Sequence, residues 1–285
     1  DAFHQALLMV APGTMLREGI SAILQGGTGA LLCFGDTAKL SNLSEGGVKL
    51  DAMVTPQLLY ELCKMDGAVI LNQDGTRMLY ANRFLKPTAK IPSEETGTRH
   101  RTAQRLAAQA KCMVIAISQR RSSVTLYVHD HRHVLDSIST LVNKASQAIQ
   151  TLEKYLSVLV QAMQELTTRE FQDMVTIFDV CRAVQRTEMV VRIANEIEPH
   201  ITELGTEGRL IDLQLRELMM PVKDALLVIK DYYREKAGSY EDVIERIAEI
   251  PPQELLQLGS ISQALGYGPN PRSIDSYLTP RGYRV

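Results

Sequence analysis

The stretch CMVIAISQRRSSVTLYV, residues 112–128, contains two apolar runs separated by a polar, basic segment. Residues 112–117 and 124–128 are rich in the β-branched and aromatic residues that favour strands. The segment 119–123 between them has the length and the polarity of a hairpin loop. The stretch therefore predicts two antiparallel strands joined by a short turn.

Strand-like apolar runs recur before this hairpin, at 29–35, 68–71 and 77–81. The polar segment 73–76 contains Asp and Gly and predicts a second hairpin turn. A helical opening is expected over residues 2–25, broken at Pro12, and Thr55 marks the start of another helix because Pro follows it. Strands with helices between them predict an α/β fold, a mixed sheet flanked by helices, over residues 1–133.

After this region the sequence takes on a helical period. Apolar residues recur every three or four positions from Leu135 to Met163, which predicts one long amphipathic helix. Thr167 and Glu170 have the spacing of a capping box. We therefore expect a second helix to begin there and to run towards Ile197.

Pro199 and the segment 205–208 are expected to end that second helix, and residues 210–236 to form a third. Long helices with one apolar stripe need a partner that buries it, so residues 134–238 predict a helical spine that packs on itself or on a second subunit. Residues 239–285 are rich in Gly, Pro and Tyr. We expect them to begin a third domain that is cut short.

The composition is that of a globular protein in a reducing compartment. Of the 285 residues, 45% are hydrophobic, and the formal net charge is −2, so any nucleic-acid contact needs a local basic patch. None of the four cysteines forms a C-x-x-C pair, and Cys33 and Cys112 lie in apolar runs, as reduced and buried thiols do. No apolar run has the length of a membrane span, and the first residues do not read as a signal peptide. These features predict a cytoplasmic protein without a membrane partner.

The first candidate for chemistry is the segment 65–68, in which Asp66 and Gly67 precede a strand. A carboxylate in this position can bind a hard cation or accept a proton from a hydroxyl group, and a glycine allows a ligand to approach the backbone. The alternative interpretation is an ordinary turn residue before a strand. The spacing alone leaves both open.

The second candidate is the segment 95–103, which enters a helix at about Thr102. Free backbone N–H groups at a helix start, together with Thr hydroxyls and Arg side chains, form an anion site, and Gly97 lets a phosphate come close. The alternative is a solvated basic turn. The sequence contains neither a P-loop nor a G-x-G-x-x-G motif, which excludes those two kinds of phosphate loop.

Taken together, the two segments narrow the choice. Asp66-Gly67-Ala68, followed by Gly97-Thr98-Arg99-His100-Arg101, resembles the signature of the diadenylate cyclase domain. The surrounding sequence is similar to the DNA integrity scanning (DisA) family over essentially the whole chain, including the segments 60–65, 79–82, 148–155, 203–208 and 280–284.

This resemblance implies an enzyme that condenses two ATP molecules into cyclic di-AMP and two pyrophosphates. Each 3′-hydroxyl attacks the α-phosphate of the other ATP across a face-to-face dimer, and the helical spine assembles dimers into a homo-octamer. Asp66 is implied to hold Mg²⁺ or Mn²⁺ and to help deprotonate the hydroxyl, with Arg99, His100 and Arg101 as further catalytic residues. The residues implied to contact the nucleotide are Gly67, Leu85, Gly97, Thr98, Arg99, His100, Arg101, Thr102, Ser118 and Arg121.

In that family a helix-hairpin-helix domain that binds branched DNA follows the spine, and the protein associates with the nucleoid. That domain is expected to follow Val285, so the resemblance implies a DNA checkpoint role for the full-length protein rather than DNA binding by this chain. The alternative function is a non-catalytic, nucleotide-binding scaffold that scans DNA. A purely structural helical oligomeriser would leave both motifs unexplained.

His129, His131 and His133 alternate near a strand end, a spacing that could place three imidazoles on one face for Zn²⁺. Because Asp130 and Arg132 intervene where the strand ends, the sequence favours a solvated hairpin edge.

Overall fold

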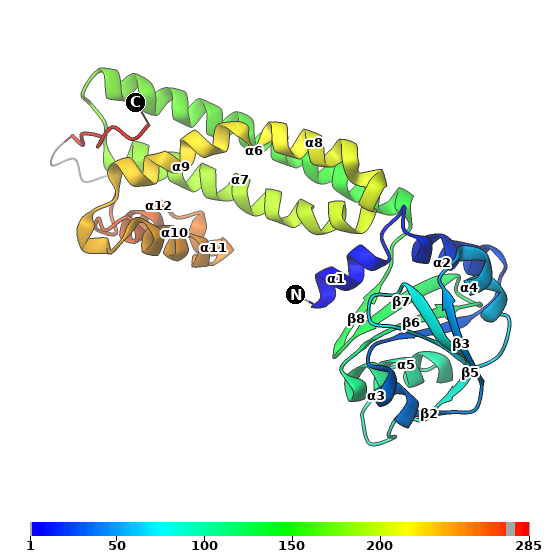
Figure 1. Cartoon of the computed structure of the whole chain (residues 1–285). Helices are drawn as coiled ribbons and strands as arrows, with labels where there is room; N and C mark the ends of the chain where they lie inside the picture. Colours follow the sequence, from blue (N-terminus) through cyan, green and yellow to red (C-terminus); the bar gives the residue numbers. More distant parts are fainter. Residues whose placement is uncertain (1, 272–276, 285) are drawn as a thin grey trace. The chain divides into compact units, whose positions relative to one another are not determined.

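The computed structural model describes residues 2–271 and 277–284, which divide into two compact units (Figure 1). The sheet unit comprises Asp1–Val142 together with Thr202–Gly208. The helical unit comprises Asn143–Ile201 and Arg209–Val285. The predicted order of secondary structure, strands first and long helices after them, is present.

In the part of the chain that the structure describes, eight strands form one sheet in the order β2-β5-β4-β1-β6-β7-β8, with β3 also paired to β5. β1 runs parallel to β4, whereas the other described strand pairs are antiparallel, so the predicted mixed sheet is confirmed. The strands are β1 (Ala30–Phe34), β2 (Ser44–Glu45), β3 (Val48–Met53), β4 (Ala68–Leu71), β5 (Arg77–Leu85), β6 (Met113–Ser118), β7 (Ser123–Val128) and β8 (His131–Val134).

The hairpin predicted over residues 112–128 is confirmed. β6 and β7 pair from Met113 with Val128 to Ser118 with Ser123. The turn predicted at 73–76 likewise joins β4 to β5. Both predictions hold because each apolar run is bounded by polar residues that cannot continue the strand inside a core.

Helices cover both faces of this sheet. Because successive strand residues point to opposite faces, Leu32 packs with one helix group and Leu31 with the other. The first group is α1 (Ala2–Met9), α2 (Met15–Gln25) and α4 (Pro56–Leu62); the second is α3 (Thr37–Asn42) and α5 (Thr98–Ala110). The start predicted for α4 is confirmed, since the Thr55 side chain accepts a hydrogen bond from the Leu58 N–H at 3.2 Å.

The helical unit is built on two long helices, as Figure 1 shows. Its elements are α6 (Ile138–Phe171), which begins in the sheet unit, α7 (Ile177–Leu204), α8 (Arg209–Leu218), α9 (Met220–Tyr232), η2 (Glu235–Ala237), α10 (Tyr240–Glu249), α11 (Pro252–Leu255) and α12 (Leu258–Ala264). The last residues of α7 and the short helix η1 (Gly205–Gly208) belong to the sheet unit. None of the described helices is both long and apolar enough to cross a membrane.

The prediction that a second helix begins at Thr167 is wrong. The Thr167 and Thr168 hydroxyls donate to the backbone carbonyls four residues earlier, both at 2.9 Å, and α6 continues through them. The next helix begins after Thr176, where the Thr176 and Asp179 side chains exchange hydrogen bonds with each other's backbone N–H groups. The capping box is therefore present, but it lies nine residues further along the chain than predicted.

Of the two breaks expected to end this helix, one is present. α7 ends at Leu204, directly before the segment 205–208, as predicted. Pro199, however, lies inside α7, where it removes one backbone hydrogen bond; the fully buried Ile197 and Leu204 on either side keep the helix in place. The single helix expected over 210–236 is divided at Met219, because Pro221 sits in the first turn of α9.

One hydrophobic core joins the long helices to the segment after residue 238. Val243 of α10 and Ile261 of α12 are fully buried with Val184 of α7 and Val228 of α9. This core crosses the boundary predicted after residue 238. The residues up to Leu265 therefore pack as part of the helical unit.

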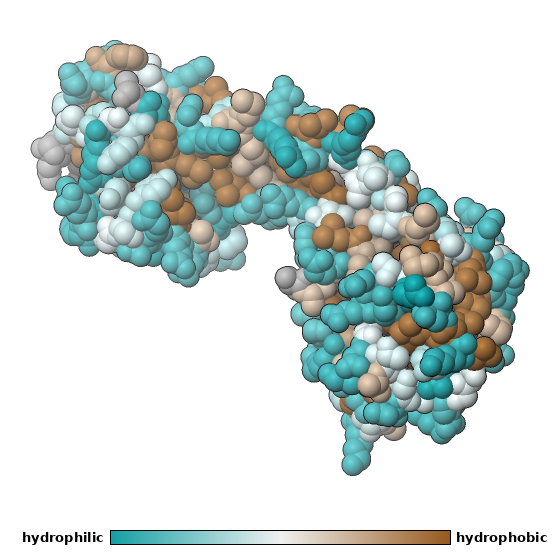
Figure 2. Space-filling view, in the orientation of Figure 1, coloured by the Kyte–Doolittle hydropathy of each residue, from teal (hydrophilic) through white to brown (hydrophobic). Residues whose placement is uncertain are grey.

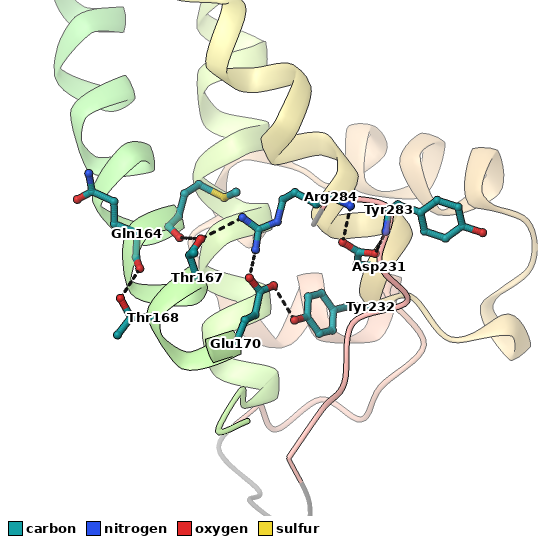
Figure 3. Close-up of polar contacts among 9 residues, drawn as sticks. Gln164, Thr167, Thr168, Glu170, Asp231, Tyr232, Tyr283 and Arg284 are labelled. Atoms are coloured by element: carbon teal, nitrogen blue, oxygen red, sulfur yellow. Dashed lines mark hydrogen bonds and ion pairs between the residues drawn. The ribbon is translucent and has the colours of Figure 1, made fainter. Parts of the chain in front are cut away.

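A C-terminal strap, residues 278–284, lies on α6 and α9 (Figure 3). The buried Asp231 carboxylate accepts hydrogen bonds from the N–H groups of Tyr283 at 2.7 Å and Arg284 at 3.3 Å. The Arg284 guanidinium pairs with the Glu170 carboxylate, which also accepts from the Tyr232 hydroxyl at 2.7 Å. The strap is thus held by charged groups that are themselves almost fully buried.

Candidate active site

The start of β1, the start of β4 and the end of β6 lie at one edge of the sheet. Their registers pair Ala30 with Ile117 and Leu32 with Val69. Neighbouring strands are about 4.8 Å apart, so residues that flank these three strand ends lie within one or two strand spacings of each other. This edge brings Gly29, Gly67 and Ser118 together.

Asp66 and Gly67 form a bend just before β4. Gly67 has φ +84°, and a Cβ atom there would lie 2.7 Å from the Arg83 carbonyl oxygen. The close approach occurs where the pairing of β4 with β5 shifts in register and Asn82 has φ +53°. Only glycine fits at position 67, and this contact leaves the preceding Asp66 exposed at the edge.

The first turn of α5 presents unoccupied donors. Gly97 is its N-cap residue, with φ −85° and ψ 137°, and no side chain caps the helix there. The Arg101 N–H makes the first backbone bond, to the Gly97 carbonyl at 2.9 Å. The N–H groups of the preceding turn are therefore available to an anion, which the helix dipole also favours.

Arg99 brings this helix start to the same edge as Asp66. Its Nη1 donates to the Ile117 carbonyl oxygen at 3.4 Å, and the guanidinium lies directly against Gly29. Since Gly29 precedes β1 and Gly67 precedes the adjacent β4, the two predicted segments meet across a single strand spacing. The two motifs are about thirty residues apart in the sequence, so the sequence alone does not show that they lie close together.

A cavity of about 270 Å³ lies beside the α5 start. Four predicted site residues line it: Gly97, His100, Ser118 and Arg121. The remaining lining residues are Glu95, Thr96 and Arg120. The other predicted residues lie outside this lining: Asp66, Gly67, Leu85, Thr98, Arg99, Arg101 and Thr102.

Three of the predicted residues that lie outside the cavity are buried or make contacts within the protein. Leu85, at 8% exposure, is buried in the core between the sheet and α5. Arg101 holds the loop before its own helix, since its Nε donates to the Glu95 carbonyl at 3.2 Å and its Nη2 to the Thr96 carbonyl at 3.3 Å. Thr102 is half-buried on α5.

Positive charge gathers at the cavity. Arg120 and Arg121 come from the β6–β7 loop, and His100 comes from α5. Burial lowers the pKa of His100; the Glu95 carboxylate opposes this effect, whereas the guanidinium of Arg99 adds to it, and the net pKa lies below its ordinary 6.5. His100 is therefore a neutral hydrogen-bonding group at pH 7, and the arginines supply the charge.

Four further residues contact the predicted motif segments without having been predicted: Gly29, Glu95, Tyr127 and Arg132. Gly29 was visible only as a glycine that bounds an apolar run. Glu95 opens the motif segment, and its carboxylate accepts hydrogen bonds from Tyr127 and Arg132. That contact depends on strand register, which no local pattern in the sequence encodes.

The three alternating histidines do not form a metal site. β7 ends at Val128, and His129, with φ +55°, lies in the turn before β8. His133 instead contacts Glu203, with 3.2 Å between Nε2 and Oε2. Within residues 2–271 and 277–284, no group of three or more His, Cys, Asp or Glu side chains is placed to hold a metal ion.

Comparisons with known proteins match two successive regions of the chain to family models. The family model described as "DisA bacterial checkpoint controller nucleotide-binding" matches residues 17–132, and "DisA bacterial checkpoint controller linker region" matches residues 135–274. A crystal structure of DacA from Staphylococcus aureus covers 48% of this chain and 91% of its own, with 22% identity and a TM-score of 0.37. That likeness is too low to add to the sequence matches.

Two curated relatives carry the assignment. The DNA integrity scanning protein DisA of Carboxydothermus hydrogenoformans is 50% identical over 98% of this chain and 80% of its own length. The protein of the same name from Clostridium perfringens is 47% identical over 100% of this chain and 80% of its own. The chain therefore belongs to the DNA integrity scanning (DisA) family, and its sheet unit is a diadenylate cyclase domain.

Proposed function

We propose that each chain binds one ATP along the edge formed by Asp66, Gly29 and the start of α5, and that two chains condense their nucleotides into cyclic di-AMP. The observation that carries this proposal is the position of Arg99, whose guanidinium lies against Gly29 and reaches Ile117. This contact supports an anion site at the start of α5 that lies close to the Asp66 carboxylate. Phosphoryl transfer needs both of these groups at one centre.

The α5 end of the edge holds the triphosphate. Backbone N–H groups of its first turn, the Thr98 hydroxyl and the guanidinium of Arg99 supply donors and positive charge. Arg121 and His100 line the adjoining cavity. As charge moves onto the leaving pyrophosphate, these fixed groups stabilise it without having to reorganise.

Asp66 supplies the base and the metal ligand. It is a single exposed carboxylate, and Mg²⁺ commonly binds to one or two carboxylates together with substrate phosphates, so the residue fits an ion that arrives with ATP. Mg²⁺ or Mn²⁺, when bound, neutralises phosphate charge and makes a nearby hydroxyl more acidic. Asp66 accepts the proton of the 3′-hydroxyl, directly or through water.

The reaction balances over two chains. Each 3′-oxygen forms a bond to the α-phosphorus of the other ATP, and the bond from that phosphorus to the bridging oxygen of pyrophosphate breaks. Two hydroxyl protons leave, and one cyclic di-AMP and two pyrophosphates result. Because one edge holds one nucleotide, the site is complete only when a second chain faces it.

Assembly of several chains also fits the surface of the helical unit. Leu210, Leu213 and Met220 are 71%, 56% and 68% exposed, and hydrophobic residues gather over this unit in Figure 2. Large exposed apolar patches commonly mark protein contacts. We extend to this chain the homo-octamer that the family resemblance implies, and gel filtration with light scattering measures it directly.

The relatives' name describes scanning of DNA integrity. By likeness to them, we infer a cytoplasmic checkpoint role in which the cyclase signals the state of DNA. Branched DNA is the partner that this role implies.

ATP turnover tests the proposal. The chain is incubated with ATP and Mg²⁺ or Mn²⁺, and cyclic di-AMP is quantified by chromatography beside Asp66→Asn and Asp74→Asn. Asp74 is the matched control, because it is also an exposed Asp before a glycine but lies at the opposite end of β4. We expect product from the parent and from Asp74→Asn and none from Asp66→Asn. A folded, oligomeric parent that binds ATP without forming product would favour the non-catalytic scaffold.

A further inference from the structure

Tyr127 and Arg132 aim at the same atom of Glu95. The Tyr127 hydroxyl lies 2.7 Å from Oε1 of Glu95, and Arg132 Nε lies 2.6 Å from it. Tyr127 of β7 is paired in register with Arg132 of β8. Because paired residues on antiparallel strands project from one face, the register itself directs both donors at the loop before α5.

The protonation states suit this contact. Burial raises the pKa of Glu95, but the hydrogen bonds from Arg132 and Tyr127 outweigh it, and the net pKa lies below its ordinary value. Burial, with the bond to Glu95, raises the pKa of Tyr127. At neutral pH, Glu95 is therefore an anionic acceptor and Tyr127 a protonated donor.

Glu95 lies two residues before the N-cap of α5, and its backbone is held as well. The Arg101 side chain donates to the carbonyls of Glu95 and Thr96. Gly97 contributes no side-chain cap of its own. The position of the free N–H groups in the first turn therefore depends on how neighbouring residues hold the loop, and the Glu95 carboxylate is the only side chain of residues 95–97 that the sheet grips.

The same contacts reach His100. Its ring meets the Tyr127 ring edge to face, with 6.4 Å between centroids and 76° between planes. Glu95 and His100 both line the cavity at the start of α5. A substitution at Tyr127 or Glu95 should therefore alter both the position of His100 and the loop before α5, which adjoin the proposed phosphate site.

We infer that Glu95, gripped by Tyr127 and Arg132, is a positioning residue that sets the phosphate-binding turn of α5 through Gly97 and His100. The inference rests on the proposed function, since it assigns a supporting role at that same site. Glu95 acts on the backbone and on His100 and takes no part in proton transfer to the nucleotide.

A simpler interpretation is that Arg132 only protects an edge. β8 ends the sheet order on its side, and charged side chains on edge strands discourage further pairing. That role needs a charge at position 132 but no particular partner. It leaves unexplained why the Glu95 side chain, 11% exposed, is buried against Arg132 and shares one oxygen with Tyr127.

The experiment separates these interpretations by nucleotide affinity. Glu95→Gln, Arg132→Gln, the double variant and Arg132→Lys are compared with the parent. KM and kcat for ATP are measured, together with the Kd of an ATP analogue whose α,β-bridging oxygen is a methylene group and which cannot release pyrophosphate. Asp130→Asn is the control, because it breaks the exposed ion pair with Lys111 in the same hairpin.

We expect Glu95→Gln and Arg132→Gln each to raise KM and the analogue's Kd about tenfold, with kcat changed less, because a charge-assisted hydrogen bond is lost. The double variant should be little worse than either single one, since both remove one contact. Arg132→Lys should recover part of the affinity, and Asp130→Asn should match the parent.

Affinities within about twofold of the parent in both single variants, or fully additive losses in the double variant, would overturn the inference. So would a loss of affinity that only follows a loss of folded protein in thermal melting. If the parent binds the analogue but makes no cyclic di-AMP, the proposed function fails, and the analogue's affinities still decide the positioning role.

Discussion

A Cβ atom added to Gly29 would lie 1.9 Å from Nη1 of Arg99. The backbone at the start of β1 is thus the surface on which the Arg99 guanidinium rests, and any side chain at position 29 occupies that space. The contact links the two motif segments. Gly29 precedes β1, which pairs with the strand that follows Asp66, and Arg99 belongs to α5.

Gly29→Ala should therefore impair the site while sparing the fold. The clash falls on the far end of a flexible side chain, so Arg99 moves and the free energy of unfolding changes by less than about 1 kcal/mol. Cyclic di-AMP formation should fall by about tenfold or more because a fixed cation is displaced from the phosphates. Initial rates test this, and Gly268→Ala, where no atom lies within 4 Å of the new Cβ, should leave them unchanged.

The two motif glycines should respond in opposite ways to alanine. At Gly67, φ +84° and the Arg83 carbonyl 2.7 Å from a Cβ make alanine strained, so Gly67→Ala should destabilise the sheet unit by about 2 kcal/mol. At Gly97, φ is −85° and the nearest atom is 3.9 Å away. Gly97→Ala should therefore cost less than about 1 kcal/mol of stability while raising KM for ATP, since the methyl group occupies the phosphate's approach.

Urea unfolding and steady-state kinetics on both variants distinguish these effects. Equal loss of stability in the two would contradict the backbone account of Gly67. A Gly97→Ala variant with unchanged KM would mean that phosphate does not approach the helix at this residue.

The sheet and the two motifs could be predicted because their signals are local. Each strand of the β6–β7 hairpin is an apolar run that stops at polar residues. Asp66 comes just before the apolar run of β4, and the second motif segment leads directly into α5. The predictions that were wrong concern helix ends, which tertiary packing decides. Thr167 and Glu170 have capping-box spacing, yet the fully buried Leu166 just before them holds that turn inside α6.

The hydrogen bonds from Tyr127 and Arg132 to Glu95 could not be predicted either, because they also depend on tertiary structure. Glu95 and Arg132 are 37 residues apart, and only the pairing of β7 with β8 brings them together. Similarly, the segment 202–208 packs in the sheet unit rather than with the helices before and after it: the Thr206 N–H donates to the Pro12 carbonyl at 3.3 Å. Such contacts depend on the finished topology.

Acid should weaken the sheet unit partly through Glu95. Because its folded-state pKa lies below the ordinary value of 4.5, its contribution to stability is fully present above that pH and is lost as the pH falls through the lower folded value. We expect Glu95→Gln to cost about 2 kcal/mol at pH 7, where the charged hydrogen bonds are intact, and less as the pH falls below 4.5. Urea unfolding at several pH values measures the difference, and a difference independent of pH would rule out the charged contact.

The C-terminal strap gives the last prediction, for the helical unit. The Glu170 and Arg284 side chains are 7% and 10% exposed, so removing one charge leaves the other buried without its partner (Figure 3). Glu170→Gln should lower the free energy of unfolding by about 3 kcal/mol, a cost typical of breaking buried pairs. Glu165→Gln, on the same helix, breaks the more exposed pair with Arg182 and should cost less than about 1 kcal/mol.

Urea unfolding followed by far-ultraviolet circular dichroism reports mainly on the long helices of this unit. Similar small costs for the two variants would show that the pair of Glu170 with Arg284 contributes little to the stability of this unit.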